Sequence, residues 1–595
     1  MIENRELETV ERLSGRGVCR RKGSLISMKR MMWIFAGFTL AVAAACFQPV
    51  RAETAINIVP APEKADVTEG TFFSIRPDTA IWTCAENDEA AEYFAALLRP
   101  ATGYPVPVSV KAPDAQENIP AGTIVVCPKL AELCAGDGPE AGFCRNAAAL
   151  GGEGYILGVS KDNVLIFANM PAGLFYGVQS FRQLLPPEIE SRTRVDGVEW
   201  KVPAVKIIDK PRFVWRGLML DVSRHFQPKE FVLKYIDTMA AFKLNHLHLH
   251  LTDDQGWRIE IKKFPSLTKI GAWRGKSDIS DEMSFAPAGE PHGGFYTQDD
   301  IRDIVAYAQK RFITIVPEIE MPGHAQAALA SLPGLSCTDK RLKVRTRWGV
   351  NKEVYCAGSD KVFDFLEAVI DEVAELFPGE YIHIGGDEVP KDRWKECPRC
   401  QARLKAEGLK DEHELQSWFI TKMEKYINSK GKKIIGWDEI LEGGLAPNAA
   451  VMSWRGVDGG IAAASQGHEV VMSPTSHCYL DYNQAKEGEP RAIGGFIPLC
   501  KVYSFEPVPA ALAPDRAKFI LGAQGNLWTE YIETPEYAEY MTYPRAAAIA
   551  EVGWTRADLK NWPDFQHRMT PVYGRLKLMG VNFRAPKPED AGLCE

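Results

Sequence analysis

The sequence lacks any excess of positive charge, and beyond the first 52 residues it lacks any run of three basic residues. Its 70 lysines and arginines face 78 aspartates and glutamates, which gives a formal net charge of −8 at pH 7. Proteins that bind nucleic acid use clustered basic side chains to neutralise phosphates. Nucleic acid is therefore not an expected partner, and an acidic surface suits a soluble protein that acts on neutral substrates.

The composition typical of disorder is also missing, because 46% of the residues are hydrophobic and 10% are aromatic. The apolar run Met31–Phe47 is too short for a typical membrane span. Two basic residues precede it and Val50-Arg51-Ala52 follows it, as in a secretory signal peptide that is cleaved after Ala52. We therefore expect export to the periplasm or the extracellular space, with no stable membrane span in the mature chain.

Three alternatives for this N-terminal segment stay open. The apolar run could be kept as an uncleaved anchor. Lipidation at Cys46 is the second, favoured by three preceding alanines and disfavoured because no leucine stands three positions before the cysteine. The residues before Met28 resemble neither a signal nor a fold, so Met28 could be the true start.

A complete set of zinc ligands is not evident among the 13 cysteines. Cys397-Pro-Arg-Cys400 has the spacing of a zinc ribbon, but no second CxxC and no spaced histidine pair follows it. A closed tetrahedral site needs four ligands, so we expect a local disulfide or two free thiols there, and no metal. Export permits disulfides, and the first candidate pairs are Cys337 with Cys356 and Cys478 with Cys500.

Two folded regions follow the signal segment. In the first, Asp88–Leu98 and Pro171–Leu185 predict helices, and Tyr155–Val159 with Val164–Phe167 predict a hairpin. This small α/β domain shows no convergent polar set, so a supporting role is expected. The predicted divisions are an extension with signal peptide (1–52), the small α/β domain (53–205) and a larger domain (206–595).

The larger domain alternates apolar strands with helical stretches, which is typical of a (β/α)₈ TIM barrel with long loops. Active sites of that fold lie at the carboxyl ends of the strands, where this chain places many acidic residues. The eight predicted strands are Val214–Leu220, His246–Leu251, Phe312–Pro317, Tyr381–Gly385, Lys433–Trp437, Ala450–Trp454, Glu469–Met472 and Phe519–Ala523.

The densest signal is the segment YIHIGGDEV, Tyr381–Val389. An apolar strand ends in two glycines, which permit a tight turn or a close approach, and then presents Asp387 and Glu388. Two carboxyls in one pocket do not both ionise easily, so one tends to keep a proton that it can donate to a glycosidic oxygen. Neighbouring residues rarely face each other across a sugar, as the acid and nucleophile of a retaining glycosidase do. The nucleophile stays unassigned on these grounds, and an acetamide of the substrate is a sensible candidate.

Six motifs in order resemble glycoside hydrolase family 20, the β-N-acetylhexosaminidases. This resemblance implies a catalytic TIM barrel after a non-catalytic α/β domain, no cofactor, and a glycan substrate with a terminal β-linked N-acetylhexosamine. The motifs are KPRFVWRGLMLDVSRHF (Lys210–Phe226), NHLHLHLTDDQGWR (Asn245–Arg258), VPEIEMPGH (Val316–His324), HIGGDEV (His383–Val389), SHCYLDY (Ser476–Tyr482) and GNLWTE (Gly525–Glu530).

The resemblance also implies roles for single residues. Glu388 would be the general acid and base, while Asp387 would polarise the acetamido N–H so that the acetamido oxygen attacks the anomeric carbon. Tyr479 would steady that oxygen. Trp437, Trp454 and Trp528 would form the apolar walls around the sugar. Its hydroxyls would be bound by Arg224, Asp481 and Glu530. The proton affinity of the acid would be set with the help of Asp253 and His324. Each has a structural alternative, such as a core tryptophan or an ion pair between Arg224 and Asp221.

Other functions are less well supported. His246, His248 and His250 share one face of a strand, but they span about 13 Å, too far for all three to bind one zinc ion. A lectin-like barrel that binds amino sugars without cleaving them would lack the acid, which is present as Glu388. A relative that releases the disaccharide lacto-N-biose is a further alternative. Phe505 is the expected counterpart of an additional tryptophan in several relatives.

Overall fold

The computed structural model describes residues 56–84, 88–111, 119–127, 147–275, 290–338, 340–588 and 590. The predicted signal segment, with its candidate cleavage and lipidation sites, lies outside these ranges. Within them, no helix is both long and apolar enough to cross a membrane.

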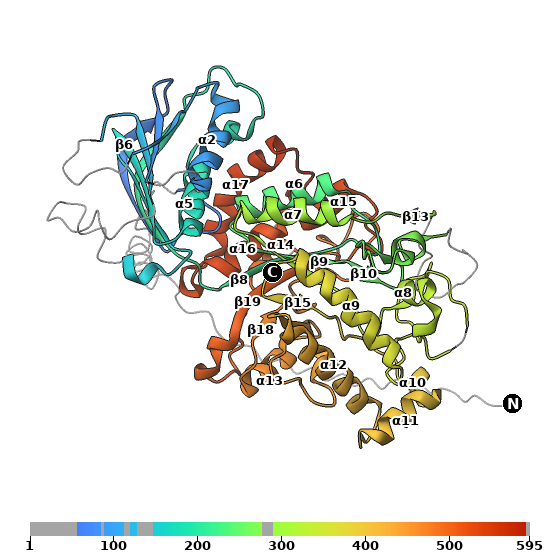
Figure 1. The fold of residues 1–595 in the computed structure, drawn as a ribbon. Helices are drawn as coiled ribbons and strands as arrows, with labels where there is room; N and C mark the ends of the chain where they lie inside the picture. The colour runs from blue at the N-terminus through green and yellow to red at the C-terminus, as the bar shows by residue number, and fades with distance from the viewer. Residues whose placement is uncertain are drawn as a thin grey trace, which may run out of the picture. The chain divides into compact units, whose positions relative to one another are not determined.

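The first domain is a seven-stranded mixed sheet in the order β1-β7-β5-β6-β4-β2-β3. Helices α2 (Glu89–Thr102) and α5 (Pro171–Leu184) lie side by side against it (Figure 1). Asp88 caps α2 by accepting from two backbone N–H groups, and Gly103 ends the helix with φ 69°. The strands are β1 Lys64–Ser74, β2 Ala80–Thr83, β3 Val108–Val110, β4 Thr123–Cys127, β5 Tyr155–Val159, β6 Asn163–Ala168 and β7 Lys201–Asp209.

Both predicted helices and the predicted hairpin of this domain are confirmed. β5 and β6 pair antiparallel, as expected for strands joined by a short turn. In β6, buried and partly exposed residues alternate along the strand, so one face packs on the helices. The sheet ends at Asp209, the last residue of β7.

The second domain is a closed barrel of eight parallel strands, which confirms the predicted fold. All eight predicted strands are present, and most boundaries agree within two residues. The largest difference is the last strand, which continues to Leu527. The strands are β8 Trp215–Asp221, β9 His246–His250, β14 Thr314–Glu318, β15 Tyr381–His383, β16 Lys433–Trp437, β17 Ala450–Ser453, β18 Val470–Met472 and β19 Ile520–Leu527.

The barrel encloses a packed core of its own. A buried cluster made only of strand residues fills its interior, as in other barrels of this type. Helices cover the outside (Figure 1), and α9 (Asp360–Leu376) is typical, because residues spaced three and four apart, such as Val362, Leu366 and Val369, are fully buried. The strands are thus packed on both faces, inside the barrel and against the helices.

Three cations of the barrel domain are neutralised by carboxylates of the first domain. Lys243 lies 3.0 Å from Asp209, and both side chains are fully buried. The other two pairs are Arg216 with Glu153 at 2.7 Å and Arg575 with Glu190 at 3.1 Å. Breaking a buried pair by removing one partner typically costs about 3–5 kcal/mol, so these contacts join the two domains firmly.

The two disulfides suggested by the sequence are not formed. Cys337, Cys356 and Cys478 are free thiols in the structure. A different disulfide joins Cys84 to Cys127 across the first domain. Sequence spacing could not select it, because these residues lie 43 positions apart and are brought together by the pairing of β2 with β4.

Candidate active site

A cavity of about 190 Å³ lies at the carboxyl ends of the barrel strands. The structure brings ten of the eleven predicted site residues to its wall. The eleventh, Asp253, is buried and contacts the cavity residues Arg224 and His324. The ten are Arg224, His324, Asp387, Glu388, Trp437, Trp454, Tyr479, Asp481, Trp528 and Glu530.

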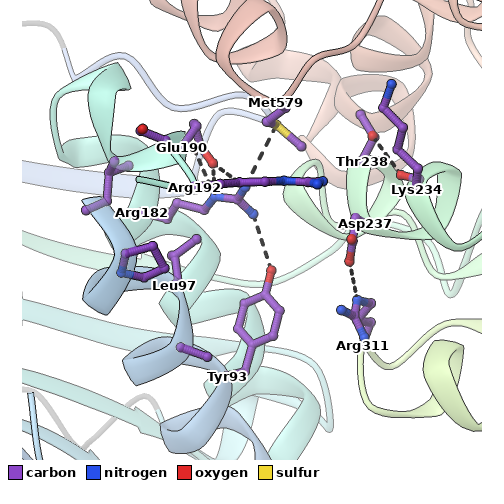
Figure 2. Close-up of a pocket in the computed structure, with 14 residues that line it drawn as sticks. Tyr93, Leu97, Arg182, Glu190, Arg192, Lys234, Asp237, Thr238, Arg311 and Met579 are labelled. Carbon is purple, nitrogen blue, oxygen red and sulfur yellow. Dashed lines mark hydrogen bonds and ion pairs between the residues drawn. The ribbon is translucent and has the colours of Figure 1, made fainter. Parts of the chain in front are cut away.

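A larger cavity of about 310 Å³ lies where the first domain meets the barrel (Figure 2). Four of its charged side chains already form two ion pairs. Arg182 is bound to Glu190 and donates to the hydroxyl of Tyr93 at 3.3 Å, while Arg311 lies 2.5 Å from Asp237. Each pair lies within one domain and neutralises charges of the cavity wall, so the chemistry points to the smaller cavity.

The backbone around Asp387 and Glu388 turns sharply after β15. Gly385 and Gly386 have φ of 68° and 94°, and Glu388 itself has φ of 44°. A Cβ atom on Gly385 would lie 1.7 Å from the carboxylate of Glu320. The glycine therefore admits a neighbouring side chain of the protein, and the left-handed conformation of Glu388 is the kind of backbone strain that collects at functional sites.

His324 lies between the buried acids and the two candidate catalytic carboxyls. Its Nδ1 is 3.3 Å from Asp253, and its Nε2 is 3.5 Å from Asp387 and 3.7 Å from Glu388. Burial by itself lowers the pKa of His324, but the carboxylates of Asp253 and Asp387 raise it well above the ordinary value. This raised pKa favours a protonated imidazole, whose positive charge lies close to both carboxyl groups.

The two neighbouring carboxyls have pKa values that move in opposite directions. Burial raises the pKa of Asp387; His324 opposes the rise, Glu388 adds to it, and the result is about 6. The nearby imidazole of His324, 3.7 Å away, lowers the pKa of Glu388, whose side chain is 39% exposed. In the free protein the last proton of the pair therefore resides on Asp387, the residue that the resemblance assigns to polarising the substrate.

Asp387 also carries an unused acceptor. Its Oδ1 atom is buried and has no hydrogen-bond partner among the residues that the structure describes. A buried acceptor without a partner costs free energy unless a ligand supplies a donor. Asp387 lines the cavity walled by the tryptophans, so its carboxyl group is suited to accept from an N–H of a bound molecule.

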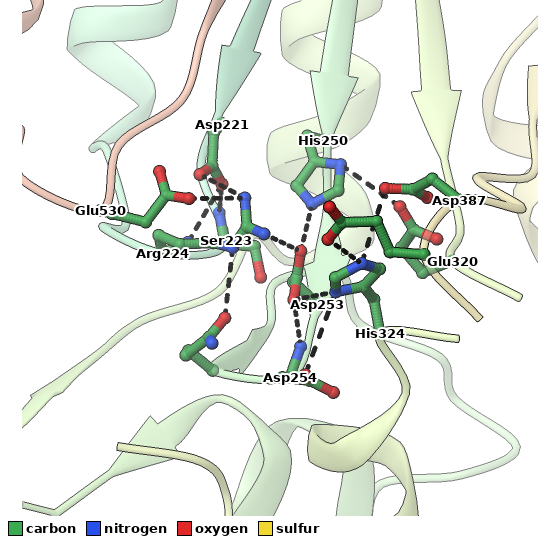
Figure 3. A network of polar contacts seen from close by, with 12 residues as sticks. Asp221, Ser223, Arg224, His250, Asp253, Asp254, Glu320, His324, Asp387 and Glu530 are labelled. Carbon is green, nitrogen blue, oxygen red and sulfur yellow. Dashed lines mark hydrogen bonds and ion pairs between the residues drawn. The ribbon is translucent and has the colours of Figure 1, made fainter. Parts of the chain in front are cut away.

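Arg224 anchors one end of the cavity through several carboxylates (Figure 3). Its guanidinium lies 2.7 Å from Asp253, 3.2 Å from Asp221 and 3.8 Å from Glu530. The ion pair with Asp221, considered from the sequence as an alternative, thus exists together with a position on the cavity wall. Burial opposes its charge, but these acids keep the pKa of Arg224 well above its ordinary value.

The tryptophans on the wall are oriented by buried acids behind them. The indole N–H of Trp437 donates to Glu318 at 2.8 Å, and that of Trp454 donates to Glu439 at 2.8 Å. The ring of Trp454 stacks on Tyr479 with centroids 6.2 Å apart. The rings are therefore fixed before any ligand arrives, which limits the entropy lost on binding.

Asp481 and Glu530 place two carboxyls at the same end of the cavity as Arg224. Burial and the neighbouring Glu530 raise the pKa of Asp481 well above its ordinary value. The Oδ1 atom of Asp481 is buried and has no hydrogen-bond partner within the described ranges. Together with Arg224, these groups offer donors and acceptors that fit the hydroxyls of a sugar.

Three residues of the cavity wall were not predicted from the sequence. Thr475, Tyr482 and Ile493 also line the cavity. Tyr482 was within the quoted SHCYLDY motif and could have been found there, whereas Thr475 and Ile493 belong to loops without a signal. Phe505 is buried, stacks on His477 and does not line this cavity, and its equivalence to a tryptophan of several relatives stays a prediction.

The three alternating histidines of β9 do not converge on one point. His248 lies 3.0 Å from Glu318, which also contacts His383 at 2.8 Å, while the ring of His246 stacks on Trp215. His250 contacts Glu318 and lies 2.9 Å from Asp253. These side chains form a buried polar layer that supports Trp437 and Asp253.

Both domains match profiles of known protein families. Residues 213–557 match the profile "Glycosyl hydrolase family 20, catalytic domain", and residues 55–210 match "Glycosyl hydrolase family 20, domain 2". A beta-hexosaminidase of Porphyromonas gingivalis is 53% identical over 442 residues, which cover 74% of this chain but only 56% of that relative. The chain thus aligns with little more than half of the relative's length.

Solved structures cover the chain more completely. The GH20 beta-N-acetylhexosaminidase of Streptomyces coelicolor superposes with a TM-score of 0.75 and 32% identity, over 90% of this chain and 98% of that one. The GH20 exo beta-N-acetylglucosaminidase of Vibrio harveyi, solved with N-acetylglucosamine, gives a TM-score of 0.75 and 32% identity, over 89% and 78% of the two chains.

Proposed function

Because this chain belongs to glycosyl hydrolase family 20, we propose that it is an exo-acting, retaining β-N-acetylhexosaminidase. Its substrate would be a glycan that ends in β-linked N-acetylglucosamine or N-acetylgalactosamine. The observation that carries the proposal is the unpartnered Oδ1 atom of Asp387 beside fixed tryptophans. An acetamido group supplies both the N–H that this acceptor lacks and a methyl group that suits apolar walls.

The nucleophile in this proposal belongs to the substrate. Asp387 accepts the acetamido N–H and increases the electron density on the acetamido oxygen, which attacks the anomeric carbon. Glu388 donates its proton to the departing oxygen, and a cyclic oxazoline-type intermediate forms. Glu388 then removes a proton from the water that opens the ring, so the β configuration is retained. This is the substrate-assisted exception to the scheme with two facing carboxylates.

In this proposal, substrate binding moves the shared proton from Asp387 to Glu388, the residue that donates it. Glu388 is partly exposed in the free protein, so a bound sugar that covers it removes water and raises its pKa. The N–H donated to Asp387 favours the ionised form of that group, and its negative charge raises the pKa of Glu388 further. The proton that Asp387 holds in the free protein is thereby transferred to Glu388.

The size of the cavity supports removal of a single sugar. About 190 Å³ is below the range of about 300–1,000 Å³ found for drug-sized ligands. Arg224, Asp481 and Glu530 occupy one end, where the hydroxyls of a non-reducing terminal sugar would lie. A disaccharide-releasing enzyme would need a second sugar position beyond these side chains.

The direct test is hydrolysis of a panel of nitrophenyl glycosides. We expect cleavage of the β-N-acetylglucosaminide or the β-N-acetylgalactosaminide. The β-glucoside, which has no acetamide, and the α-N-acetyl anomer should be inert. Release of intact lacto-N-biose from its nitrophenyl glycoside, without cleavage of the monosaccharide substrates, would contradict the proposal.

The pH dependence of kcat/KM should reflect the pair of acids. The active form carries one proton on the pair, and the free protein loses that proton through Asp387, whose pKa is about 6. We therefore expect kcat/KM to fall as the pH rises above about 6. It should fall again below the lowered pKa of Glu388, where the pair gains a second proton.

Initial rates at low substrate concentration measure this profile, because kcat/KM reports groups of the free enzyme. In Asp387→Asn the proton of the pair can reside only on Glu388, whose pKa is lower. The decrease of kcat/KM at high pH should therefore begin at a lower pH. If kcat/KM of this variant falls over the same pH range as that of the unaltered protein, another group controls the decrease at high pH.

We also propose that the protein is exported, as its N-terminal segment predicts. The disulfide between Cys84 and Cys127 supports this proposal, because such bonds persist mainly in oxidising compartments. N-terminal sequencing of the mature protein, recovered from the periplasm or the medium, should begin at Glu53. A lipid-modified Cys46 at the mature N-terminus would contradict cleavage after Ala52.

A further inference from the structure

Four cysteines from three separate segments meet at one point outside the cavity. Cys337 follows the 3₁₀ turn Pro333–Leu335, and Cys356 lies in the loop before α9. Cys397 and Cys400 lie at the start of α11 (Pro398–Ala406). One Sγ atom from each residue lies within 4.8 Å of all the others, and three of the four residues are buried.

The distances between the sulfur atoms distinguish two kinds of site. The Sγ atom of Cys356 is 3.7 Å from that of Cys397 and 3.7 Å from that of Cys400, which is also 3.7 Å from that of Cys337. A disulfide would need about 2.0 Å. Four sulfurs at about 2.3 Å from a central zinc ion are about 3.8 Å apart, because a tetrahedron's edge is about 1.6 times its centre-to-corner distance.

The surrounding chain is built closely around this cluster. A Cβ atom on Gly358 would lie 2.4 Å from the backbone nitrogen of Cys400 and 2.1 Å from the carbonyl carbon of Arg399, so this approach requires glycine. The guanidinium of Arg399 donates to the carbonyl of Ser336 at 2.8 Å and lies beside the thiols of Cys356 and Cys397. Its charge would partly offset the two negative charges of a zinc ion bound by four thiolates.

We propose that Cys337, Cys356, Cys397 and Cys400 bind one structural Zn²⁺ ion. Thiolates favour this metal, and a tetrahedral set of four sulfurs is a closed structural site with no open position for substrate. Each thiol loses its proton on binding, so loading one ion releases four protons. The sequence predicted no metal here, because no second CxxC and no spaced histidine pair follow Cys400, whereas Cys337 and Cys356 precede Cys397 on the chain.

The bound ion would link the two loops that carry the acid pair and its histidine. The N–H of Tyr355, beside Cys356, donates to the carbonyl of Pro322 at 3.0 Å, two residues before His324. The indole of Trp394 donates to the carbonyl of Tyr355 at 2.9 Å, and Trp394 lies between Glu388 and Cys397 on the chain. The zinc site would thus hold the loop after β14 against the loop after β15.

Metal analysis of the full-length protein tests the proposal. After dialysis against EDTA, elemental mass spectrometry should find about one zinc per chain, because a buried four-thiolate site exchanges slowly. X-ray absorption at the zinc edge should show four sulfur neighbours at about 2.3 Å. This measurement uses the unaltered chain and does not depend on any variant folding.

The double variant Cys356→Ser, Cys400→Ser should lose the zinc. Cys478→Ala is the matched control, because Cys478 is also a buried free thiol but lies outside the cluster, and it should keep about one zinc per chain. The proposal is overturned if the unaltered protein carries no zinc and peptide mapping finds the four cysteines joined in pairs. Iron at the site in place of zinc would also overturn it.

Discussion

Replacing Glu388 by glutamine is expected to slow the hydrolysis of substrates with poor leaving groups by about 10² to 10⁴-fold, the usual contribution of a positioned general acid. Substrates with good leaving groups, such as dinitrophenyl glycosides, need little protonation and should lose much less. The comparison separates proton donation from binding, because both substrates place the same sugar in the cavity. Steady-state kinetics on a chitobiose-type and a dinitrophenyl substrate measure the difference.

Glu380→Gln is the control for this substitution. Glu380 immediately precedes the same strand, β15, but its exposed carboxylate pairs with Lys433 at the opposite end of the barrel, 2.9 Å away. Its rates on both substrates should match those of the unaltered protein. Equal losses on both substrates in Glu388→Gln would show that this residue is not the proton donor.

Replacing Asp387 by asparagine should lower the rate by about 10² to 10³-fold, the range found when one preorganised polar contact to a transition state is removed. Asparagine keeps the shape of the side chain but cannot supply the negative charge that polarises the acetamide. Asp392→Asn is the control, because this residue is exposed and pairs with Lys352 at the surface. The control should retain full activity.

The same hypothesis predicts how changes in the substrate act. Fluorine on the acetamido methyl group weakens the oxygen as a nucleophile, so each added fluorine should slow cleavage further. Proton NMR of the first product should show the β anomer. Early appearance of the α anomer would contradict retention. An unchanged rate, together with covalent labelling of a carboxylate by a fluorosugar, would assign the nucleophile to the protein.

The barrel could be predicted because its strands are short apolar runs at regular spacing, and such a pattern leaves few alternatives. β16 has the boundaries that the sequence predicts, Lys433–Trp437. The site residues could be found because they follow these strands and match family motifs. The strand pattern and the family motifs can both be recognised without knowing the path of the loops.

Features that depend on long-range contacts could not be predicted. The four-cysteine cluster forms only when three segments of the chain come together, and the spacing of cysteines in the sequence does not predict this. Its members are Cys337, Cys356, Cys397 and Cys400. The two glycines before the acid pair form the predicted turn, but the sequence could not show that Gly385 also admits the carboxylate of Glu320. The position of the shared proton depends on burial and on the charge of His324, which residue order does not reveal.

The ion pairs between the two domains limit how far the chain can be shortened without loss of stability. A shortened protein that begins at residue 210 would retain Lys243, Arg216 and Arg575 but would lose the three carboxylates that neutralise them. Isolated charges in an apolar interface destabilise a fold and expose a surface prone to aggregation. The first domain is thus an internal scaffold of the barrel. Heat should unfold both in one cooperative calorimetric transition, and a minimal catalytic fragment has to include both.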